Sequence, residues 1–305
     1  MLPLDLPFDI HTVSRFIVRD SNNGDSKNNS DNKNNIKNNN KIKIYFPEHF
    51  IEQYFDEISD EVKEDERGFY ITGRKLSELE NIASKAYNCE VWYEPLEDFT
   101  FKSVIIDMSD DEIKNFKLYP RSLTIKIDNA IKLIDSNGVF VKLNDVSNHH
   151  TNARLKTAIS VIDDILKYQR TIDNLKIGSK LFIREFVNIR KDQEFRCFVC
   201  GGVLRAVSQY YCDDYFESLQ GKSGIIKLRV TEFFNKIKNL LPYYDCILDI
   251  AMFGDDINFG DSIKLIEINE YGDLYSGSAL FNWKKDYEQL FNGKEVEIRI
   301  RDKKK

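Results

Sequence analysis

Two short apolar segments near the C-terminal end of the chain each carry a single acid. They read Ile247-Leu248-Asp249-Ile250 and, after a turn, Leu265-Ile266-Glu267-Ile268-Asn269. Both segments are expected to form β-strands, where a buried carboxylate costs free energy unless a partner pairs with it. Because side chains alternate with period two along a strand, Glu267 and Asn269 are expected on the same face.

Asp249, Glu267 and Asn269 together offer hard oxygen ligands and no soft ones. Mg²⁺ accepts such a set when substrate phosphates supply further ligands. The alternative is a pair of strands whose acids face solvent. The flanking isoleucine and leucine residues on both faces favour the metal site over that alternative.

The composition indicates a folded, acidic protein. The chain has 305 residues, of which 42% are hydrophobic, enough for one large domain or two ordinary ones. Its net charge of −6 gives no reason to expect a nucleic-acid partner. The cysteine count of 5 is odd and the spacing scattered, unlike a disulfide framework. Cys197 and Cys200 have CxxC spacing, but on a strand they would point to opposite faces, which argues against a shared metal.

The N-terminal residues suggest no targeting signal. Met1-Leu2-Pro3-Leu4-Asp5 lacks a basic start and an apolar core, and no stretch approaches the length of a membrane span. We therefore expect a soluble, monomeric protein in the reducing cytoplasm, with no membrane partner.

Composition shifts divide the chain into five parts. An N-terminal segment, 1–20, precedes an insertion at 21–40 that is rich in Asn, Lys, Ser and Asp and is expected to be disordered. An N-terminal α/β subdomain is expected at 41–176, and a C-terminal antiparallel sheet backed by helices at 177–292. Residues 293–305 are expected to be a frayed basic tail. The fold class is therefore α+β.

Hydrophobic periodicity places the individual elements. In the N-terminal part, strands are expected at 41–46, 69–72, 89–93, 100–106, 122–127 and 139–143, and helices at 47–58, 77–86, from 109, at 130–134 and at 153–169. In the C-terminal part, strands are expected at 180–186, 194–199 and 203–209 with a turn at 201–202, and helices at 225–240 and 278–291.

Several residues in these strands suit a nucleotide. The end of the strand at Arg184, Glu185 and Phe186 can offer backbone groups and an aromatic wall to a flat heterocycle. Arg196 presents a planar fork for phosphate, although a solvated cross-strand pair between Glu194 and Arg196 is the alternative. Lys142, near a strand end, is either a surface lysine or a phosphate ligand. Both glycine-rich phosphate-loop motifs are absent, so a nucleotide would bind without a P-loop.

The order of these residues resembles the ATP-grasp proteins and, more narrowly, the cell division cycle 123 family. The resemblance covers about residues 90–290, and its most specific run is the one from Glu194 to Val199. The matching pieces are Trp92-Tyr93, Phe101-Lys102-Ser103-Val104-Ile105, Lys142-Leu143-Asn144, Arg184, Glu194-Phe195-Arg196-Cys197-Phe198-Val199, Val207-Ser208-Gln209, Asp249-Ile250, Ile266-Glu267-Ile268-Asn269 with Gly272, and Leu280-Phe281-x-Trp283.

The resemblance implies an ATP-grasp-like fold and assigns roles to matching positions. Lys142 would contact an ATP phosphate, and Arg196 would lie beside the phosphates or a supporting acid. The hinge that holds the adenosine would be formed by Arg184, Glu185 and Phe186. Mg²⁺ bridging the β- and γ-phosphates would be held by Asp249, Glu267 and Asn269.

The resemblance also implies a function. Family members are assembly chaperones for translation initiation factor 2 that engage its gamma subunit and promote its joining to the alpha subunit. Two alternatives stay open: an ATP-grasp ligase that forms an acyl-phosphate or nucleotidyl intermediate, and a diverged, non-catalytic interaction module. The chain departs from the family at Asp145, where a tryptophan is usual, at Tyr210, where an arginine is usual, and at Glu267-Ile268-Asn269-Glu270, where Asp-Phe-Asn-Pro is usual.

Overall fold

The computed structural model divides the chain into two compact units, residues 1–86 and 87–305. The described residues are 17–18, 43–46, 62–65, 68–71, 88–134, 136–143, 154–254, 260, 262–272 and 276–302. The predicted insertion at 21–40 and the predicted helices at 47–58 and 77–86 lie outside them.

The first unit contains a small antiparallel sheet with strand order β1-β2-β4-β3. Its strands are β1 (Ile17–Val18), β2 (Lys43–Phe46), β3 (Val62–Asp65) and β4 (Gly68–Ile71). The strands predicted at 41–46 and 69–72 correspond to β2 and β4.

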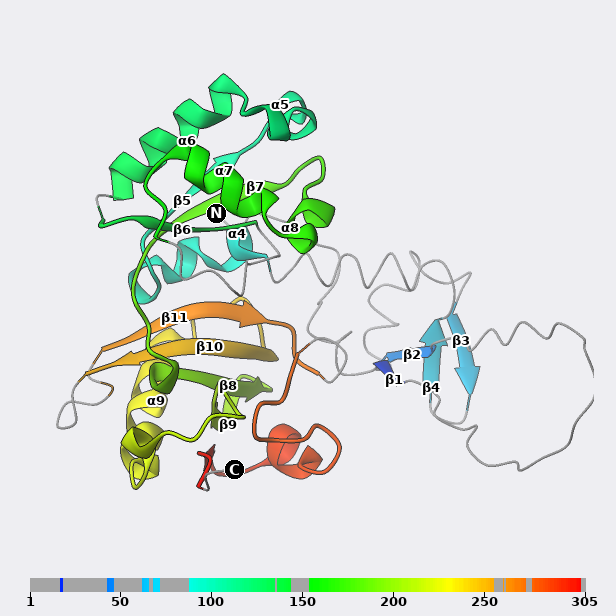
Figure 1. The fold of residues 1–305 in the computed structure, drawn as a ribbon. Helices are drawn as coiled ribbons and strands as arrows, with labels where there is room; N and C mark the ends of the chain where they lie inside the picture. The colour runs from blue at the N-terminus through cyan, green and yellow to red at the C-terminus, as the bar shows by residue number, and fades with distance from the viewer. Residues whose placement is uncertain are drawn as a thin grey trace, which may run out of the picture. The chain divides into compact units, whose positions relative to one another are not determined.

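The second unit has an N-terminal lobe built on a three-stranded antiparallel sheet of order β5-β7-β6 (Figure 1). Its strands are β5 (Ser103–Asp107), β6 (Val139–Leu143) and β7 (Lys180–Glu185). Helices α6 (Arg121–Ile134) and α7 (Ala158–Leu166) pack on it, α5 (Asp110–Lys114) joins the same core through Ile113, and α8 (Gln169–Asn174) packs against α7. Apolar residues of α6 and α7 meet those of the strands in one buried core.

Local sequence fixes where these helices begin. The hydroxyl of Ser109 accepts a hydrogen bond from the backbone N–H of Glu112, and the carboxylate of Glu112 accepts one from the backbone N–H of Ser109, so a capping box starts α5. Thr157 and Ser160 form the corresponding box at α7. The first N–H of α7 also donates to Asp128 of α6, at 2.9 Å, which ties the two helices together.

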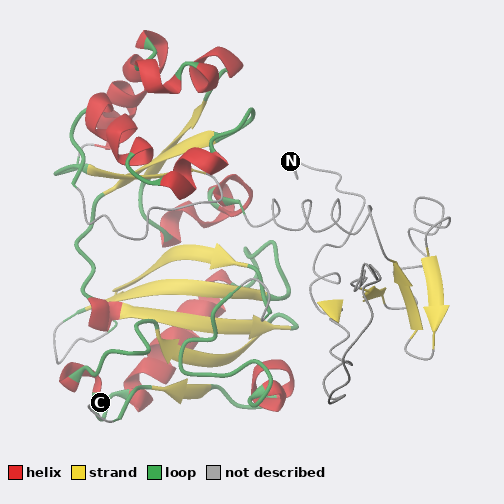
Figure 2. Cartoon of the chain, turned by 45° about the vertical axis from the view of Figure 1, so that its right-hand side comes forward, coloured by secondary structure: helices red, strands yellow, loops and turns green. Residues whose placement is uncertain are grey.

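The C-terminal lobe is a five-stranded sheet of order β11-β10-β8-β9-β12, and helix α9 (Ser223–Ile237) lies behind it (Figure 2). Its strands are β8 (Glu194–Cys200), β9 (Val203–Gln209), β10 (Cys246–Phe253), β11 (Ser262–Asn269) and β12 (Glu297–Arg299). The predicted hairpin turn is confirmed: Gly201 and Gly202 have φ of 64° and 68°, as a two-residue hairpin turn requires.

Short irregular elements complete the second unit. They are α4 (Cys89–Trp92), η3 (Glu94–Phe99), η4 (Phe116–Leu118), η5 (Lys191–Gln193), η6 (Glu217–Leu219) and the π-helical turn η7 (Glu288–Asn292).

Four predictions about individual elements were wrong. The strand predicted at 89–93 is helix α4, and the one at 122–127 lies inside α6, where Leu123 and Ile127 continue to Ala130 and Ile134 at helical spacing. The helix predicted at 278–291 is a series of turns ending in η7. The predicted frayed tail contains β12, which pairs in parallel with β9, because sheet pairing supplies hydrogen bonds that the local sequence does not reveal.

Strand β7, the first strand after the predicted subdomain boundary, belongs to a different sheet than expected. β7 was assigned to the C-terminal sheet, but it is the central strand of the N-terminal lobe, paired with β5 and β6. The chain therefore crosses between the lobes after β7, in the segment that leads to η5 and β8.

Candidate functional site

A row of polar side chains crosses the C-terminal sheet on one face. In the strand register, Asp249 of β10 lies opposite Arg196 of β8 on one side and Glu267 of β11 on the other. Arg196 in turn lies opposite Ser208 of β9. Directly opposed residues in an antiparallel sheet project to the same face, so these four side chains are neighbours.

The pair between Arg196 and Asp249 is buried and has two parallel hydrogen bonds. Nε and Nη2 of Arg196 donate to Oδ1 and Oδ2 of Asp249, each at 2.8 Å, and the side chains are 12% and 6% exposed. Asn269 donates from Nδ2 to the same carboxylate at 2.9 Å. Burial lowers the pKa of Arg196, but Asp249 outweighs this effect, so the pKa lies above its usual value. Arg196 therefore remains charged.

The third nitrogen of Arg196 extends the network beyond the sheet. Nη1 donates to the carbonyl of Gly277 at 2.7 Å. The ring of Tyr210 lies 4.9 Å from the guanidinium carbon, within range of a cation–π contact. Tyr210 thus stands against the guanidinium, at the position where the family resemblance places a second arginine.

The N-terminal lobe contributes a lysine to the row. Nζ of Lys142, on β6, lies 2.6 Å from Oε1 of Glu267, and the two side chains are 3% and 22% exposed. Burial alone would lower the pKa of Lys142, but Cys89 and Glu267 beside it raise the pKa above its usual value. Lys142 is thus a buried cation paired across the lobes, not a surface lysine.

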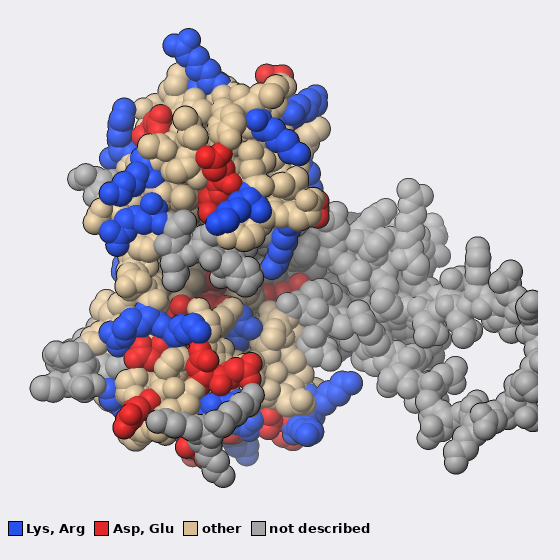
Figure 3. All heavy atoms as spheres, in the orientation of Figure 1, with Lys and Arg blue, Asp and Glu red and all other residues tan. Residues whose placement is uncertain are grey.

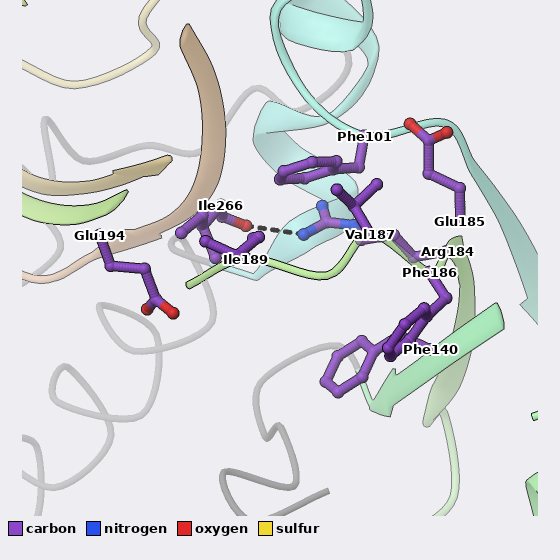
Figure 4. A pocket seen from close by; sticks show the side chains of 9 residues that line it. All are labelled: Phe101, Phe140, Arg184, Glu185, Phe186, Val187, Ile189, Glu194 and Ile266. Carbon is purple, nitrogen blue, oxygen red and sulfur yellow. Dashed lines mark hydrogen bonds between the residues drawn. The ribbon is translucent and has the colours of Figure 1, made fainter. Parts of the chain in front are cut away.

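An aromatic pocket of about 150 Å³ adjoins this row (Figure 4). It is lined by Phe101, Phe140, Arg184, Glu185, Phe186, Val187, Ile189, Glu194 and Ile266. Aromatic rings and aliphatic side chains form most of the wall, and the segment leaving β7 runs along it (Figure 4). Such an apolar slot with a few polar groups suits a flat heterocycle.

The hinge residues of the sequence prediction line this pocket, but two of the three side chains are engaged elsewhere. Arg184 is 5% exposed and its Nη1 donates to the carbonyl of Ile266 at 2.7 Å. The carboxylate of Glu185 accepts from the backbone of Lys102 at 2.9 Å. The ring of Phe186 is exposed to the pocket, with the guanidinium of Arg154 5.1 Å away.

Glu194 also lines the pocket, whereas the sequence indicated it only as a possible partner of Arg196. Its carboxylate lines the pocket, and Tyr211 donates to it at 3.4 Å. Burial, and after it the charge of Asp249, raises the pKa of Glu194 to about 7. The sequence signal for Glu194 is its position two residues before Arg196 on β8, because residues two apart on a strand face the same side, here the side of Asp249.

The residues predicted as metal ligands are brought together. Asp249 and Glu267 are opposite each other, and Asn269 reaches Asp249 directly. Two carboxylates and an amide oxygen fit Mg²⁺, which takes few protein ligands and completes its shell with phosphate and water. Within the described residues, no cluster of three or more His, Cys, Asp and Glu side chains forms an all-protein metal site. The chemistry of the donor set thus fits a metal that arrives with a phosphorylated ligand.

The surface of the described residues shows no extended patch of one charge in the view of Figure 3, where basic and acidic side chains are interspersed over both lobes. Among the helices that the structure describes, none is both long and apolar enough to cross a membrane.

Comparisons with known proteins agree with the resemblance seen in the motifs. A family model described as D123 matches residues 120–305. A CDC123-like protein of Acanthamoeba polyphaga mimivirus is 30% identical over 304 residues, covering 85% of this chain and 93% of that protein. A translation initiation factor eIF2 assembly protein of Danio rerio is 26% identical over 121 residues, covering 39% of this chain and 32% of that protein.

The structure of Cdc123 from Schizosaccharomyces pombe has a TM-score of 0.62 to this chain at 20% identity, over 72% of this chain and 97% of that one. This likeness shows that the second unit shares the fold of Cdc123, and the helices and antiparallel sheets confirm the predicted α+β class. With the family model and the mimivirus relative, they confirm the recognition made from the motifs: the chain belongs to the D123 family, the cell division cycle 123 family.

Proposed function

We propose that this protein binds ATP with Mg²⁺ and acts in the cytoplasm as an assembly chaperone for translation initiation factor 2, through the gamma subunit of that factor. The observation that carries the ATP part is the meeting of two buried cation–carboxylate pairs beside an aromatic pocket. Lys142 is paired with Glu267, and Arg196 with Asp249.

Charge balance supports a metal-bound nucleotide over a free one. Lys142 is matched by the partly buried Glu267 and Arg196 by the buried Asp249, so these two pairs are neutral without ligand. A triphosphate alone would bind Lys142 and Arg196 and leave Asp249 and Glu267 without their cations. For the buried Asp249, the loss of its partner costs roughly 3–5 kcal/mol. Mg²⁺ that arrives with the phosphates compensates these two acids, because it neutralises negative charge on both the nucleotide and the protein.

Each remaining residue has a task in this proposal. The adenine lies against Phe101, Phe140 and Phe186, with backbone groups after Phe186 to accept and donate hydrogen bonds at its edge. Glu194, on the wall of the same pocket, accepts hydrogen bonds from the ribose hydroxyls. Lys142 and Arg196 bind phosphate oxygens, while Asp249, Glu267 and Asn269 hold the metal.

The partner rests on family relationships. The Danio rerio relative carries the name of an eIF2 assembly protein, and the motifs place this chain in the same family. We infer that the partner is the same factor and that its gamma subunit makes the contact.

Binding experiments test the nucleotide part. We expect calorimetry to show that Mg²⁺ raises the affinity of the wild-type protein for ATP. Glu267→Gln should weaken binding of Mg·ATP at least tenfold, since it removes a charged ligand and leaves Lys142 without its acid. The matched control is Asp107→Asn on β5, whose side chain is 81% exposed, and it should bind like the wild type. Equal affinities for all three proteins would reject the ATP·Mg²⁺ site.

A pull-down with purified gamma subunit tests the partner, and no retention of that subunit would reject it. Incubation with labelled ATP separates a chaperone from the alternative ATP-grasp ligase. Net formation of ADP or AMP in the presence of cell extract, at a rate abolished by Glu267→Gln, would favour the ligase.

A further inference from the structure

The acid Glu267 reaches its place through an irregularity in the sheet. The outer halves of β10 and β11 pair regularly from Phe253 and Ser262 to Ile250 and Leu265. One further step in that register would put Ile266 opposite Asp249. The structure instead has Glu267 opposite Asp249, so Ile266 is an extra residue and forms a β-bulge.

The bulge has a consequence for the backbone. In a regular strand, successive carbonyls point to opposite edges, but here the carbonyls of Leu265 and Ile266 both point to the N-terminal lobe. Oγ1 of Thr100 donates to the first at 2.7 Å, and Nη1 of Arg184 donates to the second at 2.7 Å (Figure 4). β11 is the edge strand of its sheet, and beyond it Thr100 forms only an isolated parallel bridge with Leu265, so Thr100 and Arg184 supply side-chain donors to these two carbonyls.

Arg184 is held firmly in the position that this contact requires. Its Nε donates to Oγ of Ser103 at 3.1 Å, and its Nη2 lies 3.5 Å from Oγ1 of Thr100. The rings of Trp92 and Phe101 each have their centre 5.8 Å from the guanidinium carbon. The guanidinium is thus fixed between aromatic rings and points at the bulge, and its donors serve protein acceptors.

We propose that Arg184 is a positioning residue: it pins the bulge at Ile266 and thereby sets Glu267 opposite Asp249 and against Lys142. The proposal rests on the proposed function for the role of Glu267, but the bulge itself is independent of that function. Loss of the contact would favour the regular register, and a slip of one residue moves every side chain to the other face. An isoleucine would then face Asp249, and the metal site would lose one of its two acids.

The test compares ATP affinity with and without Mg²⁺, and the ratio of the two dissociation constants is the Mg²⁺ gain. Arg184→Met keeps the apolar stem and removes all donors. We expect its Mg²⁺ gain to fall at least tenfold relative to wild type. An effect of the variant on the shape of the pocket cancels from this ratio, because it changes ATP affinity equally with and without Mg²⁺. The affinity for adenosine, which has no phosphate, reports on the pocket separately. Ser103→Ala is the matched control, because it removes one acceptor of Arg184 but leaves the contact to Ile266; its Mg²⁺ gain should equal that of wild type.

A second measurement reads the bulge directly, using Arg184→Lys in case the methionine variant does not fold. A lysine cannot replace three separate contacts, so hydrogen exchange should become at least tenfold faster at the amides of Glu267 and Ile268, while β9 amides keep their rates. Unchanged exchange together with an unchanged Mg²⁺ gain would overturn the proposal. A wild-type protein that binds no ATP would refute the proposed function instead, and the exchange rates of the lysine variant would then decide on Arg184 alone.

Discussion

Replacing Arg196 by methionine tests whether the buried pair with Asp249 is a principal electrostatic contact of the second unit. Methionine fills much of the arginine stem but has no hydrogen-bond donor. Asp249 would lose two bonds of 2.8 Å, while its side chain is only 6% exposed. Water can therefore compensate the carboxylate only in part, and the carbonyl of Gly277 also loses its donor.

The expected cost follows from this burial. Removing one partner of a buried ion pair destabilises a protein by about 3–5 kcal/mol, because the remaining charge is left unpaired. For a unit of this size, 1 kcal/mol corresponds to about 2–4 °C in melting temperature, so Arg196→Met should melt roughly 6–20 °C below wild type.

Arg190 provides a matched control. It also makes two hydrogen bonds to one carboxylate, that of Asp192, at 2.9 and 3.4 Å, but its side chain is 57% exposed. Exposed pairs contribute at most about 1 kcal/mol, so Arg190→Met should melt within a few degrees of wild type.

The assay is thermal and urea unfolding followed by circular dichroism, on both single variants and on Arg196→Met combined with Asp249→Asn. The second change removes the stranded charge and should recover at least half of the loss. If Arg196→Met costs no more than Arg190→Met, or if the double variant is less stable than the single one, the assignment of the energy to a buried charge is wrong.

Three further predictions concern other residues. The pKa of Glu194 is raised to about 7, and its ionised form accepts hydrogen bonds from hydroxyl groups better than the protonated form does. In calorimetric titrations, adenosine affinity should therefore rise as the pH passes through about 7, and Glu194→Gln should abolish this dependence. Burial would raise the pKa of Glu112, but hydrogen bonds from Lys126 and Ser109 hold this pKa at about 2. The stability that the ionised Glu112 adds should therefore be complete above pH 4.5 and lost as the pH falls toward 2. In urea unfolding, the free energy of unfolding of Glu112→Gln should lie below that of wild type by an amount that shrinks over this range. Gly138 has a φ of 118° and an added Cβ would overlap Arg154, so Gly138→Ala should lower the unfolding free energy by about 1–3 kcal/mol in urea.

The predicted site residues were accessible from sequence where they depended on alternation within one strand. Glu267 and Asn269 are two residues apart, and they do share a face with Asp249. Alternation along β8 likewise places Arg196 on this face, and it predicts that Glu194, two residues earlier, lies there too. The roles of these residues in binding ATP and Mg²⁺ remain proposals.

Contacts between distant segments were not accessible in the same way. Alternation of Leu123, Ile125 and Ile127 suggested a strand, but the longer helical spacing that continues to Ile134 determines the structure. The parallel pairing of β12 with β9 joins residues about ninety positions apart, such as Ile298 and Val207, and a basic tail carries no local pattern for it. For the same reason, the sequence could not show that β7 belongs to the N-terminal sheet.

The bulge at Ile266 shows why alternation along one strand accounts for only part of the arrangement of the predicted ligands. Alternation correctly places Glu267 with Asn269, but it says nothing about which residue of the neighbouring strand lies opposite. The outer register of β10 and β11 would place isoleucine there, and only the extra residue brings Glu267 into line with Asp249. If Arg184 positions the bulge as proposed, a metal site with acids on two adjacent strands depends on the hydrogen bond that this residue of the N-terminal lobe donates to the carbonyl of Ile266.

Tyr210 affects the number of cations at the row. With tyrosine at the position of the family arginine, the cations that the described residues offer to phosphates at the row in the proposed function are Lys142 and Arg196, and each already has an acid as its partner. Phosphates can recruit these two cations only if Asp249 and Glu267 gain another positive charge. A chain with a third cation at this point could bind the nucleotide with less help from the metal. Under the proposed function, the tyrosine should therefore make nucleotide binding more strictly dependent on Mg²⁺, because the ion must compensate both Asp249 and Glu267 once the phosphates bind their cations.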